Sequence, residues 1–318
     1  MKNMIPQKAN IKELIKEQNS DAIFQENIAN LIPSAQGKNR IPLTISNYIK
    51  LYTWGGLKYF GIYDRLLFSN LILSWFNEFK CYWVNELKGF NMRPHDFFFL
   101  LGDFRKLTDL ELGDNQDGEK QLEVWQDPRA IYFLLSQRYK VALNPFEAKK
   151  FSKYIKKNSL ICEYGCGMAP ITRSIERFYQ HKNVRIHCVD IPTFPFHYIR
   201  WYFKKYKRYK FCDFIQIKPD NDSTLTETYD VVFILNVFEH LPSPYKTIIH
   251  LTEHLKVGGF LIFNYIKTDG TTLDTKAGSL ERNDTISYIN ENYSILNGSI
   301  DSDKDIINTI AQKKQTSK

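Results

Sequence analysis

The chain has 318 residues, of which 43% are hydrophobic and 25% are charged. This balance is typical of a soluble globular protein with a core of ordinary size, so neither a metal nor a disulfide is needed to explain folding. The net charge of +8 leaves a nucleic acid or an anionic membrane surface open as a partner, although a lysine-rich surface is the simpler explanation.

The five cysteines lack paired C-x-x-C spacing, so a zinc site is disfavoured and no metal is expected. They are Cys81, Cys162, Cys166, Cys188 and Cys212. A reduced protein in the cytoplasm is the expected setting. The first residues, MKNMIPQKANIKELIKEQNS, contain no continuous apolar run, so no signal peptide is expected. The most apolar stretch, residues 65–76, is too short and too polar to span a bilayer.

Before residue 146, apolar residues recur at intervals of three and four, which predicts a mainly helical region over residues 1–145. The segments with this period are NIKELIKEQ, ISNYIKLYTW, YDRLLFSNLILSWFNEF and RAIYFLLSQRYK. Breaks at Pro33 and at Gly55–Gly56 separate them.

From residue 146 onward, helical and strand patterns alternate. Strands are expected at 159–165, 183–190, 212–218, 229–237 and 258–266. Helices are expected at 146–157, 171–182, 197–210 and 243–255. Nearly continuous apolar strands separated by helices predict an α/β fold with a mostly parallel sheet covered on both faces. Such a sheet binds ligands at the carboxyl ends of its strands.

The first of these strands ends in a glycine turn that leads into the next helix. Gly165 and Gly167 allow positive φ and close approach of a ligand, and Pro170 suits the first helical position. A dinucleotide site requires G-x-G-x-x-G, and Pro170 stands where the third glycine belongs. No Gly-Lys-Ser/Thr follows either, so a pyrophosphate ligand is disfavoured.

Asp190 ends the second strand at the same edge of the predicted sheet. A carboxylate in this position accepts hydrogen bonds from both hydroxyls of a ribose. An ordinary strand-end carboxylate facing water is the alternative. Together with the glycine turn, Asp190 favours an adenosine-containing ligand.

Four segments in this order and spacing, CEYGCGMAP, CVDIP, YDVVFILNVFEHLPSP and HLKVGGFLIFNYI, resemble the class I S-adenosylmethionine-dependent methyltransferases. The resemblance covers residues 146–318, with Glu163, Gly165 and Gly167 matching the first motif and Ala169 in place of its third glycine. It implies a Rossmann-like sheet of seven strands in the order 3-2-1-4-5-7-6, with helices on both faces. YSILNGSI and IINTIAQKK would form its antiparallel sixth and seventh strands.

The resemblance also implies that S-adenosylmethionine is the cofactor and which residues bind it. The positions that match the family are Glu163, Gly165, Gly167 and Ala169 for the methionine part, Asp190 for the ribose, Ile191 and Asp220 for the adenine, and Asn236 and Val237 near the sulfur. Glu163 would hold the amino group of the methionine part. The family resemblance further implies an enzyme that transfers a methyl group.

His240 and Glu239 follow the fourth strand and are the candidate catalytic residues, with His240 the better base because histidine titrates near neutrality. The alternative is that both residues brace the following loop. His197 and Tyr198 are further candidates. The segment LNVFEH lacks the Asn/Asp-Pro-Pro-aromatic motif of methyltransferases that act on base amino groups, so that activity is disfavoured.

The acceptor is expected to be a small or sugar-like molecule, with oxygen favoured over nitrogen. The helical region 1–145 is expected to cap its pocket, because the sheet itself holds mostly cofactor. The basic aromatic helix 197–210 suggests an RNA or protein methyltransferase as an alternative. A helix that simply covers the sheet would show the same pattern. A third alternative is a non-catalytic binding protein of the same fold.

Overall fold

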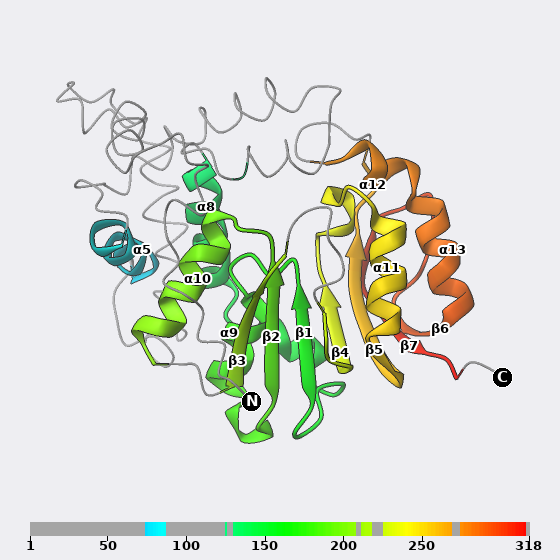
Figure 1. Cartoon of the computed structure of the whole chain (residues 1–318), viewed down its shortest axis with the longest axis horizontal. Coiled ribbons are helices and arrows are strands. Elements are labelled where there is room, and N and C mark those ends of the chain that lie inside the picture. The colour runs from blue at the N-terminus through cyan, green and yellow to red at the C-terminus, as the bar shows by residue number, and fades with distance from the viewer. Residues whose placement is uncertain are drawn as a thin grey trace.

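The computed structural model describes residues 74–86, 125, 130–207, 211–217, 225–268 and 274–315. The helices expected before residue 74, the end of the basic helix at 208–210 and the candidate adenine contact Asp220 lie outside these residues. Figure 1 shows the arrangement: one twisted sheet with helices packed around it.

The sheet has seven strands in the order β3-β2-β1-β4-β5-β7-β6, which confirms the predicted topology. The strands are β1 (Leu160–Tyr164), β2 (Arg185–Asp190), β3 (Cys212–Gln216), β4 (Tyr229–Ile234), β5 (Leu255–Tyr265), β6 (Tyr293–Asn297) and β7 (Ile306–Lys313). The first five pair in parallel, whereas β7 is antiparallel to both β5 and β6.

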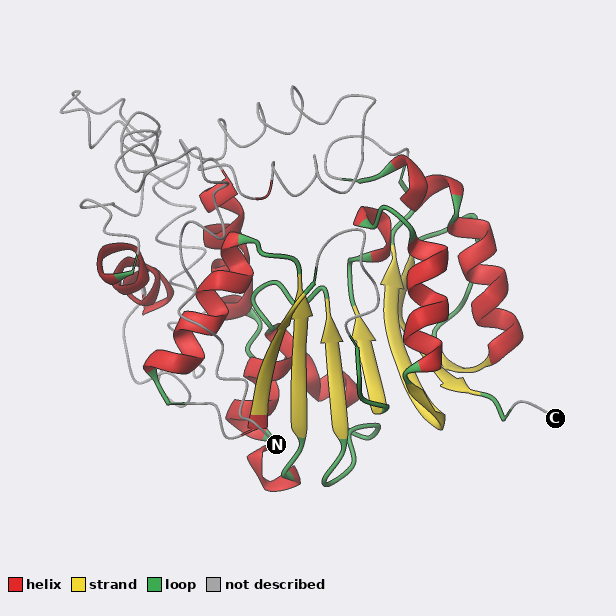
Figure 2. Cartoon of the chain, viewed as in Figure 1, coloured by secondary structure: helices red, strands yellow, loops and turns green. Residues whose placement is uncertain are grey.

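Helices cover both faces of this sheet (Figure 2). The α-helices are α5 (Ser74–Asn85), α8 (Ile131–Leu143), α9 (Pro170–Phe178), α10 (Phe194–Lys205), α11 (Pro244–Glu253), α12 (Lys276–Leu280) and α13 (Arg282–Asn292). Short 3-10 turns are η4 (Glu147–Phe151), η5 (Gln180–Lys182) and η7 (Phe238–His240). Among the helices that the structure describes, none is long and apolar enough to cross a membrane.

The strands are apolar throughout because their two faces belong to two different cores. Alternate residues of β1 and β4, such as Ile161 and Val231, pack with η4, α9 and α10. Their neighbours Cys162 and Val232 pack with α11 and α13 on the other face. Side chains of a strand point to alternate faces, so a strand buried on both sides needs apolar residues at every position.

Three helices differ from the sequence prediction, and the one expected at 171–182 ends at Phe178, before the 3-10 turn η5. The segment expected as a helix over 146–157 forms only the 3-10 turn η4, although Phe151 and Ile155 are both buried as a helix face would bury them. The basic helix begins before residue 197, at Phe194, because the Thr193 side chain caps it by accepting a hydrogen bond from the Phe196 amide at 3.2 Å.

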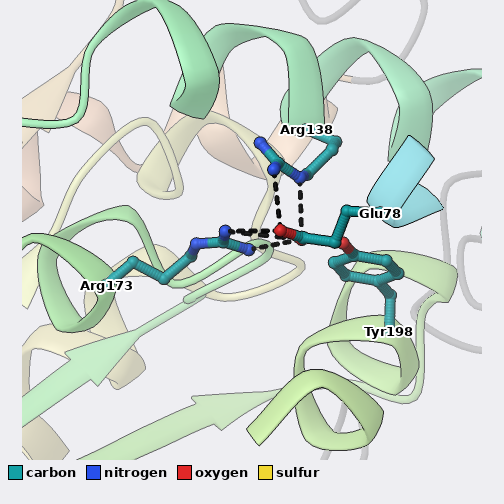
Figure 3. Close-up of polar contacts among 4 residues, drawn as sticks. All are labelled: Glu78, Arg138, Arg173 and Tyr198. Carbon is teal, nitrogen blue, oxygen red and sulfur yellow. Dashed lines mark hydrogen bonds and ion pairs between the residues drawn. The ribbon is translucent and has the colours of Figure 1, made fainter. Parts of the chain in front are cut away.

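A buried ionic cluster joins the described part of the N-terminal region to the sheet domain (Figure 3). The Glu78 carboxylate of α5 accepts two hydrogen bonds from Arg138 of α8, both at 2.9 Å, and lies 3.3 Å from Arg173 of α9. The Tyr198 hydroxyl of α10 donates to the same carboxylate. Four helices therefore meet at one carboxylate.

Candidate active site

The glycine turn connects β1 to α9 at the carboxyl edge of the sheet. Gly165 and Gly167 have φ of +63° and +49°. A Cβ on Gly165 would lie 2.4 Å from Val237 Cγ2 after β4, and one on Gly167 would lie 2.5 Å from Gln137 Oε1 of α8. Glycine is required at Gly165, where the short Val237 side chain leaves no room for a Cβ, and it is favoured at Gly167 by the positive φ, since the Gln137 side chain can move.

Glu163 lies at the other side of the turn and stabilises the start of α9. Its carboxylate accepts hydrogen bonds from the amides of Ile171 and Thr172, at 3.0 and 2.9 Å, and from the Thr172 hydroxyl at 2.5 Å. A negative group at a helix N-terminus is favoured by the helix dipole. Burial raises the pKa of Glu163, whereas these hydrogen bonds favour its ionised form.

Asp190 comes from the end of β2 and contacts the same turn. One carboxylate oxygen accepts from the Gly167 amide at 2.6 Å, and the other accepts from the Ile191 amide at 2.8 Å. Burial raises the pKa of Asp190 to about 7, although both hydrogen bonds act in the opposite direction. The turn and the carboxylate therefore form one rigid unit.

Two adjoining cavities lie next to the glycine turn, and Asp190 lines the first of them. The first, of about 130 Å³, is mostly apolar. Its lining includes Asp190, Ile191, Ile217, Val237, Leu241 and Trp125. The second, of about 560 Å³, is more polar, and its lining includes Lys140, Asn144, Glu163, Asn264 and Met168. Phe133, Gln137, Tyr164, Gly165, Asn236 and His240 line both. The two cavities thus form one crevice within the size range of ligand pockets.

His240 lies where the two cavities meet. Its Nδ1 is 3.0 Å from Asp274 Oδ1, and its Nε2 is 4.0 Å from Glu239 Oε1. Burial alone would raise the pKa of Asp274, but the contact with His240 lowers it. Asp274 therefore stays ionised beside the imidazole.

Glu239 precedes His240 in the chain and lines neither cavity. Its side chain is 4% exposed, and burial raises its pKa. Its carbonyl oxygen accepts from the Thr275 amide at 2.8 Å, and the residue abuts Gly278 of α12. These contacts favour the bracing role that the sequence left open.

The remaining candidates fall into two groups. Asn236, at φ +57°, and Val237 line the crevice, and Asn264 Nδ2 donates to Asn236 Oδ1 at 2.9 Å. His197 and Tyr198 line neither cavity, because they point toward α5: Tyr82 bonds to His197 at 2.5 Å.

The sequence did not indicate Asp274, Gln137 or Asn264 as site residues. Asp274 belongs to the loop between β5 and α12, and Gln137 belongs to a helix far earlier in the chain. The sequence spacing between Asp274 and His240, or between Gln137 and Gly167, gives no sign that these residues meet in the fold. Only Asn264 could have been predicted, because a polar residue near the end of β5 lies beside the end of β4 in a parallel sheet.

Residues 162–261 match a family model described as a methyltransferase domain. This segment runs from β1 into β5 and includes the glycine turn, Asp190 and His240. The chain contains a class I methyltransferase domain. The protein is therefore an enzyme of methyl transfer.

Several solved structures are similar to this chain, and the one with a TM-score above 0.5 shares its fold. An O-methyltransferase family protein from Burkholderia thailandensis is similar with a TM-score of 0.51 at 13% identity, covering 87% of this chain and 100% of that one. TehB from Haemophilus influenzae has a TM-score of 0.39 at 16% identity, covering 53% of this chain and 62% of that one. The N-methyltransferase NodS from Bradyrhizobium japonicum WM9 has a TM-score of 0.39 at 15% identity, covering 54% of this chain and 98% of that one. No curated protein sequence matches the chain.

Methyltransferase domains of this family use S-adenosylmethionine, and the residues of the crevice fit this cofactor. Gly165 and Gly167 of the glycine turn line the first cavity. The carboxylate of Asp190 lines the first cavity among apolar groups such as Ile191 and Val237. A carboxylate for ribose hydroxyls and an apolar wall for adenine are the groups that an adenosine needs.

Proposed function

We propose that this methyltransferase acts on a hydroxyl group of a small, polar or sugar-like acceptor bound in the second cavity, with His240 as the general base. The His240–Asp274 pair at the junction of the two cavities is the observation on which the proposal rests. S-adenosylmethionine, when bound, supplies a methyl group already activated by its sulfonium. The acceptor must then be positioned and, if it is a hydroxyl, deprotonated.

The contact with Asp274 determines how His240 would work. The carboxylate accepts the Nδ1 proton at 3.0 Å, which leaves Nε2 as the atom that accepts a proton from the acceptor. Once protonated, the imidazolium is stabilised by the negative charge of Asp274. An amine acceptor needs only to be neutral and gains less from this pair, so oxygen is the favoured target.

The polar lining of the second cavity supports a hydroxylated acceptor. Lys140, Asn144, Asn236 and Asn264 offer donors and acceptors of hydrogen bonds around this volume. Asn236 is held in orientation by Asn264, whose own Oδ1 accepts from the Asn308 amide at 2.5 Å. Oriented amides of this kind suit a molecule with several hydroxyl groups.

The contacts of α8 support the proposal that the N-terminal region 1–145 forms a cap over a separate methyltransferase domain at 146–318. Phe133, Gln137 and Lys140 of α8 line the crevice. Gln137 Oε1 accepts from the Met168 amide of the glycine turn at 3.1 Å. The cap would therefore contact the cofactor site as well as form part of the acceptor pocket.

The remaining cofactor contacts are proposed from the same geometry. Gly165, Gly167 and Ala169 would adjoin the methionine part, Glu163 its amino group, and Asn236 and Val237 the sulfur. Asp190 would accept hydrogen bonds from the ribose hydroxyls, with Ile191 against the adenine.

The five free thiols favour the cytoplasm as the location of the protein.

The alternative of an RNA methyltransferase that uses the basic helix gains no support from α10. Tyr198, Trp201 and Phe203 are buried, so their rings cannot stack on bases. Arg200 donates to Gln216 at 3.2 Å, and Lys205 contacts Cys81. These contacts are those of a helix that covers the sheet and binds α5.

Replacing Asp190 with asparagine or alanine is expected to weaken S-adenosylmethionine binding by about ten- to hundredfold, because hydrogen bonds to an ionised group contribute roughly 1.5–3 kcal/mol. Isothermal titration calorimetry with S-adenosylmethionine and S-adenosylhomocysteine measures this. Asp213→Asn is the matched control, since its side chain is 63% exposed on β3. Unchanged affinity in both Asp190 variants would remove this residue from the cofactor site.

An assay of S-adenosylhomocysteine formation with paired acceptors tests the target atom. Hydroxyl acceptors, such as sugars and phenols, are expected to be methylated in preference to amines of the same shape. Turnover of the amines alone would contradict O-methylation. Turnover of bulk RNA that falls steeply with added salt would favour the basic-helix alternative instead.

A further inference from the structure

The C-terminal end of α11 has three side chains of the types that bind transition metals, and the third of them, His254, is the C-cap residue that follows the helix. His250, Glu253 and His254 stand at positions i, i+3 and i+4, so they share one face of the helix. One ligand atom of each lies within 4.8 Å of those of the other two. Ligands about 2.1 Å from a tetrahedral metal are roughly 3.4 Å apart. Small rotations of the exposed Glu253 side chain and the two rings close this difference.

The His254 imidazole is already oriented for such a role, and the His250 ring lies beside it. His254 Nδ1 is 3.0 Å from the carbonyl oxygen of His250, and the two ring centroids are 4.4 Å apart. A ring N–H that donates to a backbone carbonyl fixes the tautomer and leaves Nε2 as the ligand atom. Metal-binding histidines commonly have this arrangement.

The charges around the cluster favour a cation overall. The carbonyl end of α11 has the negative pole of the helix dipole, and Glu253 adds a carboxylate. The opposing charge is Lys313, whose Nζ donates to the carbonyls of Thr252 and Leu255 at 2.6 and 2.7 Å. Lys313 therefore offsets part of the negative charge that attracts a metal, and the two imidazoles, which are neutral ligands, supply the remaining affinity.

The cluster is separate from the crevice. Pro242, just before α11, lines the first cavity, whereas Glu253 is the last residue of the helix. Ten residues of α-helix span about 15 Å. Figure 1 shows α11 running from the carboxyl edge of the sheet toward its amino edge, where β5 begins.

We propose that His250, Glu253 and His254 form a binding site for a divalent first-row transition metal of the Zn²⁺ and Ni²⁺ class. Two imidazoles and one carboxylate supply three ligands, and water completes the coordination. A metal there ties the last turn of α11 together at the point where the chain enters β5. The site is independent of methyl transfer.

Calorimetry with Ni²⁺ on the untagged full chain tests the site. Ni²⁺ suits imidazole ligands and avoids thiolates better than Zn²⁺ does, so the five cysteines compete less. One saturating equivalent is expected for the wild type. His250→Ala and His254→Ala are each expected to weaken binding at least tenfold, and the exposed substitution Glu253→Gln, which leaves the fold intact, by several-fold.

His240→Ala is the matched control, because His240 also has carboxylates within 4.0 Å, those of Asp274 and Glu239. Its Ni²⁺ affinity is expected to equal that of the wild type. The site is wrong if the wild type shows no saturable binding. It is equally wrong if His240→Ala abolishes binding while the three α11 variants retain it. Neither result bears on methyl transfer.

Discussion

Replacing Glu78 with alanine is expected to lower the free energy of unfolding by about 3 kcal/mol, because it leaves two buried guanidinium groups without their anion. Arg138 and Arg173 have side chains that are only 7% and 13% exposed. Both contact the Glu78 carboxylate, and Tyr198 donates to it as well (Figure 3). Without Glu78, two positive charges face each other away from water.

The pKa of Glu78 follows from the same contacts and makes this stability depend on pH. Burial alone would raise this pKa, but the charges of Arg138 and Arg173 lower it from 4.5 to about 2. A depressed folded-state pKa contributes stability above the unfolded value, which is lost as pH falls through the folded one. The wild type is therefore expected to lose about 3 kcal/mol between pH 5 and pH 2 that Glu78→Ala does not lose.

Urea unfolding followed by both tryptophan fluorescence and circular dichroism measures this effect. Trp75 and Trp83 are buried on α5, beside Glu78, so fluorescence reports on the cluster, whereas dichroism reports on the whole fold. Glu227→Ala is the matched control, because it removes an exposed ion pair with Arg185 and is expected to change stability by less than about 1 kcal/mol. Equal stabilities of the Glu78 and Glu227 variants would refute the proposed role of the cluster.

The sequence predicted the sheet domain well because its signals are local. A strand buried on both faces is apolar throughout, as β1 and β4 are, and a turn with positive φ that packs against Val237 favours glycine. Asp190 was found because a strand end is also local. These features need no knowledge of what lies across the fold.

The rest of the site depends on contacts between distant segments, which no local pattern encodes. Glu163 matches the first motif, yet the sequence could not show that its carboxylate accepts the amides that begin α9. The basic helix illustrates the same limit, because Arg200 and Lys205 find partners on β3 and α5. The partner of His240 comes from a loop beyond β5.

His240→Ala is expected to lower kcat for methyl transfer by about 10²–10⁴-fold, the usual contribution of a general base. KM for the acceptor and the affinity for S-adenosylmethionine are expected to change little, because His240 acts on the proton and not on the body of either molecule. Only a neutral imidazole accepts a proton, so kcat of the wild type falls as pH falls. This dependence is expected to vanish in His240→Ala.

Variants of Asp274 test whether His240 acts as a base or only braces the loop. The carboxylate at Nδ1 affects catalysis only if Nε2 of His240 takes the proton. Asp274→Asn keeps the shape of the loop but can donate to Nδ1, which favours the wrong tautomer, so kcat is expected to fall about tenfold or more while the fold persists. Asp274→Glu should restore part of the rate. ¹⁵N NMR of the His240 ring reports the tautomer without any acceptor. Two results would contradict the proposed base: a proton on Nε2 of His240 in the wild type, or full activity in Asp274→Asn. Either result would show that the pair only braces the loop.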